Sequence, residues 1–340
     1  MDKIARLSPN QRNELFSETS AKMGIDTSLV EKDFWVCWML RLLFSEPSFS
    51  NVLLFKGGTS LSKIYNVIRR FSEDIDLAVD WKMLGYDADL AATVDDASRR
   101  KKEKLFKNLL KDCREYISGD FLTNLHEKIS KQLPAELSWQ LAVDPNNLDV
   151  VNFSYPTTGH NPDYVQSIVR LELGTQAERE PKGKFTIRPY AAKHFPEVFV
   201  APECSVNAIV AERTFWEKIT ILHKEHFRVK ERGAPGKYSR HYYDVYMITE
   251  NEGIKSKALG NLELLERVVA HKIRFFYCKW ARYELATPSE IKLLPSDDWV
   301  KYLESDYEKM QIMLYGEAPT FGEILERLEK LEKEIRSLTS

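Results

Sequence analysis

The sequence has few cysteines, no long apolar run and almost no net charge. Its four cysteines are far apart in 340 residues and form no CxxC or metal-ligand spacing, so we expect reduced thiols in a cytoplasmic protein. The longest apolar run, residues 34–44, is interrupted by Arg41 and is too short to span a membrane. The N-terminus is polar and mixed in charge, which predicts no signal peptide. A net charge of −2 argues against a protein coated with nucleic acid.

Apolar periodicity predicts an α/β (α+β) fold with two domains. We expect helices over residues 1–45, strand, helix and strand over 50–80, and a charged helical insertion at about 87–133. Further strands are expected over four apolar segments, at 137–144, 150–156, 165–173 and 185–192.

The remainder of the chain, after Pro202, is expected to be helical. We therefore predict an N-terminal domain over residues 1–202 and a helical C-terminal domain over 203–340 that completes the active site. The last helix, residues 321–338, has about two heptads of apolar residues, too few for a stable isolated coiled coil. It is expected to pack on its own chain, with a partner helix as the alternative.

The most informative segment is residues 55–80, FKGGTSLSKIYNVIRRFSEDIDLAVD. A short apolar strand leads into Gly57 and Gly58, and a helix is expected to continue from there to about Ser72. Glycine lets the backbone approach a ligand closely, and Thr59 or Ser60 can cap the helix. The free N–H groups at that helix end suit a phosphate. The alternative is a simple reversal of the chain.

Asp74 and Asp76 alternate with apolar residues and are expected to point the same way from a strand. Two neighbouring carboxylates repel each other unless a cation lies between them. Mg²⁺ is the natural cation, with Mn²⁺ as the alternative, because Mg²⁺ commonly joins one or two carboxylates to substrate phosphates. Two such ions would stabilise the attacking and leaving oxygens of a nucleotidyl transfer. The alternative is a solvated surface strand.

The segments GGTSLSK and FSEDIDL resemble the first motif of the AbiEii-type nucleotidyltransferase toxins, the group that includes the MenT toxins. That family belongs to the polymerase-β-like nucleotidyltransferase superfamily, so the resemblance implies a polymerase-β-like core built on a small mixed sheet. It also implies a nucleoside triphosphate substrate and Mg²⁺ bound by the D-x-D motif. By motif match, the nucleotide-binding and metal-binding roles fall on Gly57, Gly58, Thr59, Ser60, Asp74 and Asp76.

A second segment, residues 212–248, resembles the family's lysine helix and the R-D-x-x-D-like segment that follows it. Lys218 matches the motif lysine, Arg240 the arginine and Asp244 the final aspartate, while His241 stands where an aspartate is more usual. A helix expected over about 207–226 places Lys218 on an apolar face. Its side chain either holds nucleotide phosphates or extends from the edge of the core.

Asp244 is surrounded by apolar residues, so we expect it to be at least partly buried. It is either an internal ion-pair partner of Lys218 or Arg240, or a catalytic residue that positions the lysine or the attacking group. The resemblance implies the second role. A later strand often supplies a third acid in polymerase-β-like folds, and Glu172 is a candidate metal ligand there. A salt bridge between Glu172 and Arg170 is the alternative.

Two segments combine positive charge with aromatic residues. Residues 218–241 contain seven Lys or Arg against two Glu, and residues 271–282 interleave basic and aromatic side chains. Basic groups neutralise phosphates and aromatic rings stack on exposed bases, so these segments are candidates for RNA binding. Core packing of the aromatic residues is the alternative. A third basic cluster, residues 99–107, is expected to be a solvated helix face.

Taken with the resemblance, these features imply a Mg²⁺-dependent nucleotidyltransferase toxin of a toxin–antitoxin or phage-defence system. It would transfer a nucleoside monophosphate from the triphosphate to an acceptor, expected to be the 3′ end of tRNA. A separately encoded antitoxin would be its counterpart. The alternatives are transfer to a protein or a small molecule, and a nucleotide-binding regulator without turnover.

Overall fold

A computed structural model describes residues 1–72, 74–87, 90–95, 97–159, 166–233 and 236–338. The chain forms two compact units. The first unit contains Met1–Ile64 and Ser72–Ile209, and the second contains Tyr65–Phe71 and Val210–Ser340. In the described part of the chain, no helix combines the length and the apolar character that a membrane crossing needs.

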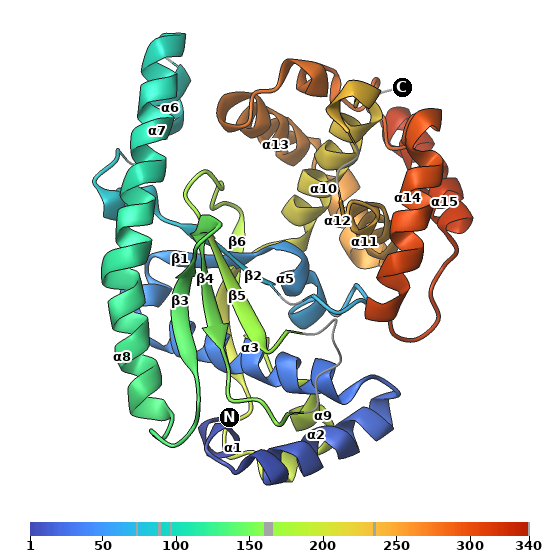
Figure 1. Cartoon of the computed structure of the whole chain (residues 1–340). Coiled ribbons are helices and arrows are strands. Elements are labelled where there is room, and N and C mark those ends of the chain that lie inside the picture. Colours follow the sequence, from blue (N-terminus) through green and yellow to red (C-terminus); the bar gives the residue numbers. More distant parts are fainter. Residues whose placement is uncertain (73, 88–89, 96, 160–165, 234–235, 339–340) are drawn as a thin grey trace. The chain divides into compact units, whose positions relative to one another are not determined.

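The first unit is built on a seven-stranded mixed sheet with strand order β3-β4-β5-β2-β1-β7-β6 (Figure 1). The pairs β1–β7 and β2–β5 are parallel, and the other neighbours are antiparallel. The predicted α/β class with a mixed sheet is therefore confirmed. The strands are β1 Leu53–Lys56, β2 Asp74–Val79, β3 Gln140–Asp144, β4 Asn147–Ser154, β5 Ile168–Gly174, β6 Lys182–Ile187 and β7 Cys204–Ile209.

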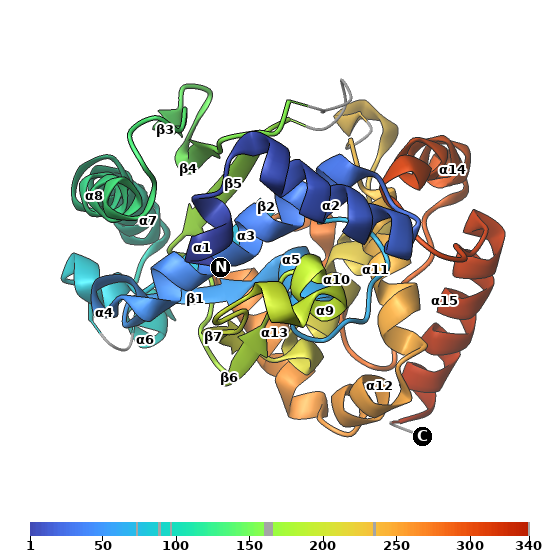
Figure 2. The ribbon, with the colours of Figure 1, turned by 90° about the horizontal axis from the view of Figure 1, so that it is seen from below.

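Helices pack against the sheet, including its edge at β3. The central one, α3, contacts β5 and β7 on one side and α2 on the other, so it separates the sheet from the N-terminal helices (Figures 1 and 2). The helices of this unit are α1 Asp2–Ala5, α2 Pro9–Met23, α3 Thr27–Ser45, α4 Pro47–Ser50, α5 Gly57–Lys63, α6 Leu90–Asp95, α7 Arg99–Tyr116, α8 Leu122–Gln132 and α9 Tyr190–His194.

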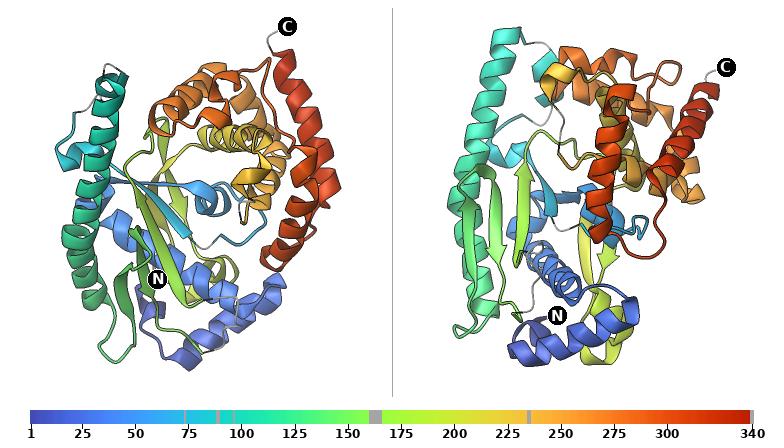
Figure 3. Two further views of the ribbon diagram at one scale, coloured as in Figure 1. Left: turned by 45° about the horizontal axis from the view of Figure 1, so that its top comes forward. Right: turned by 45° about the vertical axis from the view of Figure 1, so that its right-hand side comes forward.

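The predicted charged insertion is helical. A five-residue π-helical segment, Ile117–Phe121, joins α7 to α8, so the three form one long rod beside β3 and β4 (Figures 1 and 3). The N-terminal half of α7 extends beyond the ends of those two strands in both views. The insertion therefore presents a helix face that the sheet does not cover.

The helix α3 is buried almost throughout, and its polar residues anchor the elements that carry the first motif. Asp33 lies 2.5 Å from the Nζ of Lys63, the last residue of α5, and both side chains are buried. The other Asp33 oxygen accepts a hydrogen bond from the backbone N–H of Tyr190 at 2.7 Å. Because a buried charge is costly unless it is paired, this contact holds the end of the motif helix against the core.

The second unit is helical. Its helices are α10 Ala211–His226, α11 Ser239–Thr249, α12 Glu252–Leu259, α13 Leu262–Phe275, α14 Asp297–Met310 and α15 Phe321–Ser337. The prediction that the last helix packs on its own chain is confirmed, because α15 packs against α11 and buries the predicted apolar stripe. The fully buried residues of that stripe are Ile324, Leu328, Leu331 and Ile335.

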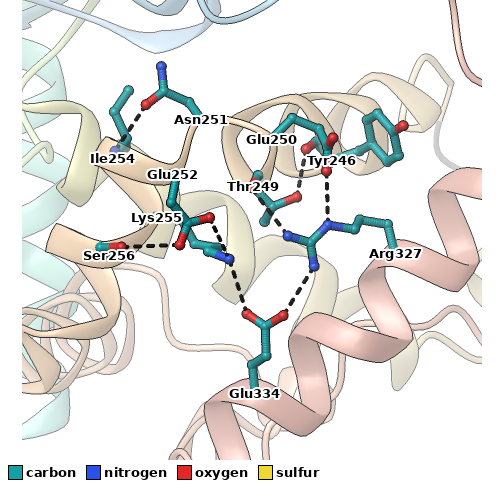
Figure 4. A network of polar contacts seen from close by, with 10 residues as sticks. All are labelled: Tyr246, Thr249, Glu250, Asn251, Glu252, Ile254, Lys255, Ser256, Arg327 and Glu334. Carbon is teal, nitrogen blue, oxygen red and sulfur yellow. Dashed lines mark hydrogen bonds and ion pairs between the residues drawn. The ribbon is translucent and has the colours of Figure 1, made fainter.

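Ion pairs add to this packing (Figure 4). Arg327 on α15 lies 3.0 Å from Glu250 and donates to the carbonyl oxygen of Thr249 at the end of α11. Glu334 lies 3.3 Å from Arg327 and 3.6 Å from Lys255 on α12. The polar face of α15 therefore ties three helices of the second unit together.

Three secondary-structure predictions are wrong. The helix after the double glycine ends at Lys63 instead of near Ser72, because residues 65–71 belong to the second unit and pair there with residues 313–315: Phe71 donates to Met313 O and Tyr315 donates to Arg69 O. The helix expected from residue 207 begins at Ala211. Residues 204–209 form strand β7 instead, because pairing with β1 and β6 satisfies their backbone.

The third wrong prediction concerns the strand expected over residues 185–192. The strand β6 ends at Ile187, and residues 190–194 form the short helix α9 after Pro189, whose fixed φ suits the position before a helix. The other three strands predicted in this region are confirmed as β3, β4 and β5, with shifted ends. Residue 165, where one of them was expected to begin, lies outside the described residues.

Candidate active site

The two aspartates of the first motif lie on β2, next to β1 and β5. The strand alternates as predicted: Asp74 and Asp76 are half-buried, and Ile75 and Leu77 are buried. Asp76 is in register with Glu172 on the parallel strand β5, so the candidate third acid lies beside the D-x-D motif. Side chains at paired positions of neighbouring strands point to the same face.

The glycine turn touches the second aspartate. Gly57 has a φ of +78°, which L side chains rarely adopt, and a Cβ at this position would lie 1.8 Å from Oδ2 of Asp76. Two separate constraints, the backbone conformation and this contact, therefore require glycine at position 57. Gly58, the second residue of α5, is half-buried. The turn and the carboxylate form one local structure.

The hydroxyl groups of the motif are used within the fold. The helix α5 begins at Gly57, so Thr59 and Ser60 lie inside its first turn, and the expectation that either caps the helix is wrong. Thr59 Oγ1 donates to the carbonyl oxygen of Asp74 at 2.5 Å and lies 2.9 Å from Ser72 Oγ. Ser60 Oγ donates to the carbonyl oxygen of Gly57 at 2.8 Å. Both residues are fully buried, so their hydroxyls fix the turn and the start of β2.

Negative charge exceeds positive charge at this edge of the sheet. Burial raises the pKa of Glu172, and the neighbouring Asp76 and Asp74 raise it further. Arg170 opposes this effect only partly, at 3.5 Å from Asp74 and 3.9 Å from Glu172, because it also pairs with Asp144 at 3.2 Å. The expected salt bridge between Arg170 and Glu172 is thus present but long.

The donor set suits a hard cation. Carboxylate oxygens are the preferred ligands of Mg²⁺, and one or two carboxylates with substrate phosphates are enough for it. Asp74 and Asp76 supply two carboxylates. Among the described residues, no group of three His, Cys, Asp or Glu side chains is arranged to hold a metal ion by itself. Asp74 and Asp76 therefore fit a site that substrate oxygens complete, and Glu172 adds to its negative charge.

The second motif lies in the second unit and is centred on one buried carboxylate. Asp244 on α11 is fully buried, and its Oδ2 lies 2.7 Å from Nζ of Lys218 on α10. Arg70 binds the same carboxylate through two N–H groups, at 2.7 Å to Oδ1 and 2.8 Å to Oδ2. The structure therefore shows the internal ion pair that the sequence left open, and it adds a second cation to it.

Positive charge exceeds negative charge around Asp244. Burial would raise the pKa of Asp244, but Arg70 and Lys218 outweigh burial and hold this pKa below its usual value. Burial lowers the pKa of Lys218 although Asp244 opposes this, and Arg70 and Arg240 lower it further. An aspartate that accepts three charge-assisted hydrogen bonds is a poor proton acceptor. Asp244 is thus arranged to position cations and not to take a proton.

Two further polar side chains, Arg240 and His241, lie close to this ion pair in the sequence. Within the described part of the chain, the buried Nε of Arg240 and the buried Nδ1 of His241 have no hydrogen-bond partner. Burial, together with Lys218 and Arg240, holds the pKa of His241 well below its usual value, so its imidazole is neutral. Position 241, where the family more often has an aspartate, therefore carries no negative charge here.

Arg70 is the residue of this cluster that the sequence analysis missed. It lies between the motif helix and the D-x-D strand, in a segment expected to be the end of that helix. The only signal in the sequence is a basic residue four positions before Asp74. Its burial, at 5% exposure, follows from the backbone pairing of residues 65–71 with Leu314 and its neighbours.

The two basic and aromatic segments of the second unit meet. The ring of Trp280 lies 5.0 Å from the guanidinium of Arg228, 5.1 Å from that of Arg232 and 5.6 Å from Nζ of Lys224. The aromatic residues divide between both expected roles: Phe275 and Tyr283 are buried, whereas Phe276 and Tyr277 are exposed. Tyr277 is 73% exposed, which leaves its ring available to a partner.

Comparison with known proteins decides the family. The sequence matches the family described as nucleotidyl transferase AbiEii toxin, type IV TA system, over residues 39–327. The chain belongs to the AbiEii nucleotidyltransferase toxin family. It is therefore a nucleotidyltransferase and a toxin of a type IV toxin–antitoxin system, which implies a cognate antitoxin.

Among solved structures, this AbiEii protein is similar to MenT4, a nucleotidyltransferase toxin from Mycobacterium tuberculosis H37Rv. The similarity covers 96% of this chain and 97% of MenT4, with 15% sequence identity and a TM-score of 0.42. A search of the curated proteins found no match.

Proposed function

We propose that this toxin transfers a nucleoside monophosphate from a nucleoside triphosphate to the 3′ end of an RNA acceptor, with tRNA as the expected acceptor. Asp74 and Asp76 bind Mg²⁺ or Mn²⁺, which supplies charge stabilisation at the transferring phosphoryl group. The turn from Gly57 to Ser60 holds the triphosphate through its backbone. Lys218, which is paired with Asp244, and Arg240 bind anionic phosphate groups.

The contact between Gly57 and Asp76 is the observation that carries this proposal. A turn whose backbone rests on a carboxylate brings N–H groups and a metal ligand to the same place, as a metal-bound triphosphate needs. The raised pKa of Glu172 supports it, since the neighbouring acids repel one another until a cation binds. If Asp74 and Asp76 lay on a solvated surface strand, neither the contact between Gly57 and Asp76 nor the raised pKa of Glu172 would be expected.

The residues of the second unit have an electrostatic role in this proposal. Arg70 and Lys218 bind one carboxylate, Asp244, and Arg240 adds a further positive charge that acts on Lys218, so the surplus suits an anionic phosphate group. Asp244 keeps the cations in place, and Arg70 acts through Asp244 as a positioning residue. Reaction then joins an acceptor hydroxyl oxygen to the α-phosphorus, and pyrophosphate leaves.

The aromatic and basic surface around Trp280 supports RNA as the acceptor. Exposed aromatic rings such as Phe276 and Tyr277 stack on unpaired bases, and Arg228 and Arg232 neutralise phosphates. A protein or small-molecule acceptor would not need this combination. A regulator without turnover would have no use for the acidic cluster on β2.

The test is to incubate the purified protein and Mg²⁺ with each labelled nucleoside triphosphate in turn and with total RNA. We expect label on the tRNA band with one preferred nucleotide and no label with the Asp74→Ala/Asp76→Ala variant. Unlabelled RNA beside measurable triphosphate binding would overturn RNA as the acceptor and favour a protein or a small molecule. Equal labelling by the variant would remove the two aspartates from the mechanism.

A further inference from the structure

The helix α7 carries a strong concentration of positive charge that the proposed active site does not use. Residues 99–111, RRKKEKLFKNLLK, contain seven basic residues and one acid, a net charge of +6 in a chain whose total is −2. A charge of this density on a small area repels itself and is usually compensated by a partner. The compensating charge has to come from the fold or from another molecule.

Four of these cations form one line on the helix surface. Arg100, Lys104, Lys107 and Lys111 follow one another at spacings of four, three and four residues, which places them on one face. All four are exposed, while Leu109 on the opposite face is fully buried. At 1.5 Å per residue, the line is about 16 Å long. We call these four residues the α7 stripe.

The fold does not neutralise the α7 stripe. In the part of the chain that the structure describes, Arg100, Lys104 and Lys107 form no ion pair. Lys111 lies 3.3 Å from Glu115, but both side chains are more than 60% exposed, so water screens this pair. The N-terminal half of α7, which projects beyond β3 and β4 (Figures 1 and 3), contains Arg100, Lys104 and Lys107. The stripe is therefore accessible to an anionic partner.

The distance from the D-x-D strand limits what the stripe can bind. Three strand spacings separate β3 from β2 in the sheet, about 14 Å in all, and the α7–α8 rod lies beside β3 and β4 at that edge. A folded RNA whose 3′ end reacts at Asp76 can also reach this helix, because its helical parts extend well beyond that end.

We propose that the α7 stripe binds the phosphate backbone of a double-helical part of the acceptor RNA, away from the reacting 3′ end. This inference rests on the proposed function. A straight line of cations about 4.5–6 Å apart matches a polyanion with closely spaced phosphates, and such contacts hold double-stranded RNA by shape and charge without reading sequence. The alternative is a helix face that only water covers, in which the surplus positive charge has no binding role.

An acidic protein partner is the rival occupant. A cavity of about 570 Å³ lies beside the C-terminal half of the stripe. It is lined by Lys107 and Lys111 and by the apolar side chains of Leu110, Val143 and Leu148. A protein segment would use that apolar lining. The stripe itself contains no apolar position and extends past the cavity toward the helix N-terminus, which favours a polyanion over a protein surface.

The test compares two variants of the full chain with the same charge change. The stripe variant is Lys104→Glu/Lys107→Glu/Lys111→Glu. The control variant is Lys301→Glu/Lys309→Glu/Lys330→Glu, three exposed lysines on α14 and α15. Both are made in the Asp74→Ala/Asp76→Ala background, so that binding is measured without turnover, and affinity for total tRNA is followed against salt concentration.

We expect the stripe variant to lose affinity for tRNA, most strongly at low salt. Each lost phosphate contact lowers the magnitude of the slope of log affinity against log salt by about 0.9, so three lysines lower it by about 3. With the active protein, the stripe changes should raise KM for tRNA, leave kcat unchanged, and leave transfer to a short single-stranded RNA unchanged. The control variant should retain the wild-type slope.

Two results would overturn the inference. If the stripe variant binds tRNA with the affinity and slope of the control, the stripe does not hold RNA, and the acidic protein becomes the occupant. The proposed function survives that result if the active protein still labels tRNA. Conversely, if the stripe changes abolish tRNA binding but the active protein labels no RNA, the stripe holds an RNA that is not the acceptor, and the proposed function fails together with the acceptor part of this inference. A protein that binds no RNA in either form overturns both.

Discussion

The acidic edge of β2 and the cluster around Asp244 have opposite charge surpluses. At β2, Asp74, Asp76 and Glu172 lie together; Arg170 pairs with Asp74 and Glu172, and Arg170 and Lys56 only partly oppose the raised pKa of Glu172. Around Asp244, two cations bind one carboxylate directly, and its pKa is lowered. The first region lacks positive charge, and the second lacks negative charge.

This difference indicates which ligand each region can accept. Repelling carboxylates are stabilised by a metal ion, while a surplus of buried cations is stabilised by phosphate. The regions also differ in what their charges contribute to the fold. The repelling carboxylates at β2 destabilise the fold slightly, whereas Asp244 stabilises it by neutralising the buried Arg70 and Lys218. Substitutions of the same chemical kind should therefore have opposite consequences in the two regions.

The largest effect on stability is expected from Asp244→Asn. The substitution leaves Arg70 and Lys218 buried without their counter-charge, which typically costs about 3–5 kcal/mol. Urea denaturation should show the loss in the free energy of unfolding, and Asp74→Asn should show none. A loss below about 1 kcal/mol would mean that water reaches the two cations and that the cluster is not a closed ion pair.

The largest effect on activity is expected from Asp76→Asn. Loss of a metal-ligating carboxylate removes several kcal/mol of transition-state stabilisation, a decrease in rate of about 10³-fold. The free energy of unfolding should stay unchanged or rise, because one of the repelling carboxylates is gone. Asp80→Asn, just beyond the end of the same strand, is the control and should retain activity. Lower stability in Asp76→Asn would contradict the comparison.

A smaller loss is expected from Gly57→Ala. The strained φ costs about 1–2 kcal/mol, and the new Cβ must displace the Asp76 carboxylate. Gly85→Ala is a matched control, since Gly85 has a φ of +83° but nothing within 4 Å of the position of a Cβ. Gly85→Ala should lose only the stability that the φ costs, Gly57→Ala should lose more, and only Gly57→Ala should lose activity. Equal activity in the two variants would show that the turn need not touch Asp76.

Thr59→Val should cost about 1–2 kcal/mol. The substitution keeps the shape of the side chain but leaves the buried carbonyl oxygen of Asp74 without its hydroxyl donor. Thr59→Ser retains the hydroxyl and should restore most of the stability. Thermal denaturation of the two variants separates the hydrogen bond from packing. If Thr59→Ser loses stability and Thr59→Val does not, the methyl group matters and the hydroxyl does not.

The smallest effect is a pH dependence of opposite sign in the two regions. The lowered pKa of Asp244 contributes stability above the unfolded value near 4, and this stability is lost as pH falls below it. The raised pKa of Glu172 acts the other way: without metal, its contribution falls as pH rises from about 4 through the folded pKa. The Glu172 effect should stay below about 1 kcal/mol, because its side chain is 41% exposed.

Urea denaturation from pH 7 down to about pH 2 checks this prediction, since Glu172 acts above about pH 4 and Asp244 below it. Glu172→Gln should flatten only the part of the profile that Glu172 causes, and added Mg²⁺ should do the same to the wild-type protein. A Glu172→Gln profile that matches wild type in the absence of metal would show that the two aspartates do not raise the pKa of Glu172.

Local patterns allowed the D-x-D strand to be predicted correctly. Alternation of Asp74 and Asp76 with Ile75 and Leu77 is a property of a few consecutive residues, and a strand preserves it. The end of α5 and the start of α10 were predicted wrongly, because each depends on strand or loop pairing with distant residues. Burial of Lys218 and Asp244 followed from their apolar neighbours, but their mutual contact did not.

The sequence by itself determined the family, the mixed α/β class and the positions of both motifs, because these depend on residue identity and short-range periodicity. Only the tertiary structure decided that Arg70 binds Asp244, that Gly57 rests on Asp76 and that the hydroxyls of Thr59 and Ser60 are used within the fold. The physical reason is that partners of buried polar groups are chosen by packing between distant segments. Charge surplus at a site depends on those partners and not on the motif that marks the site.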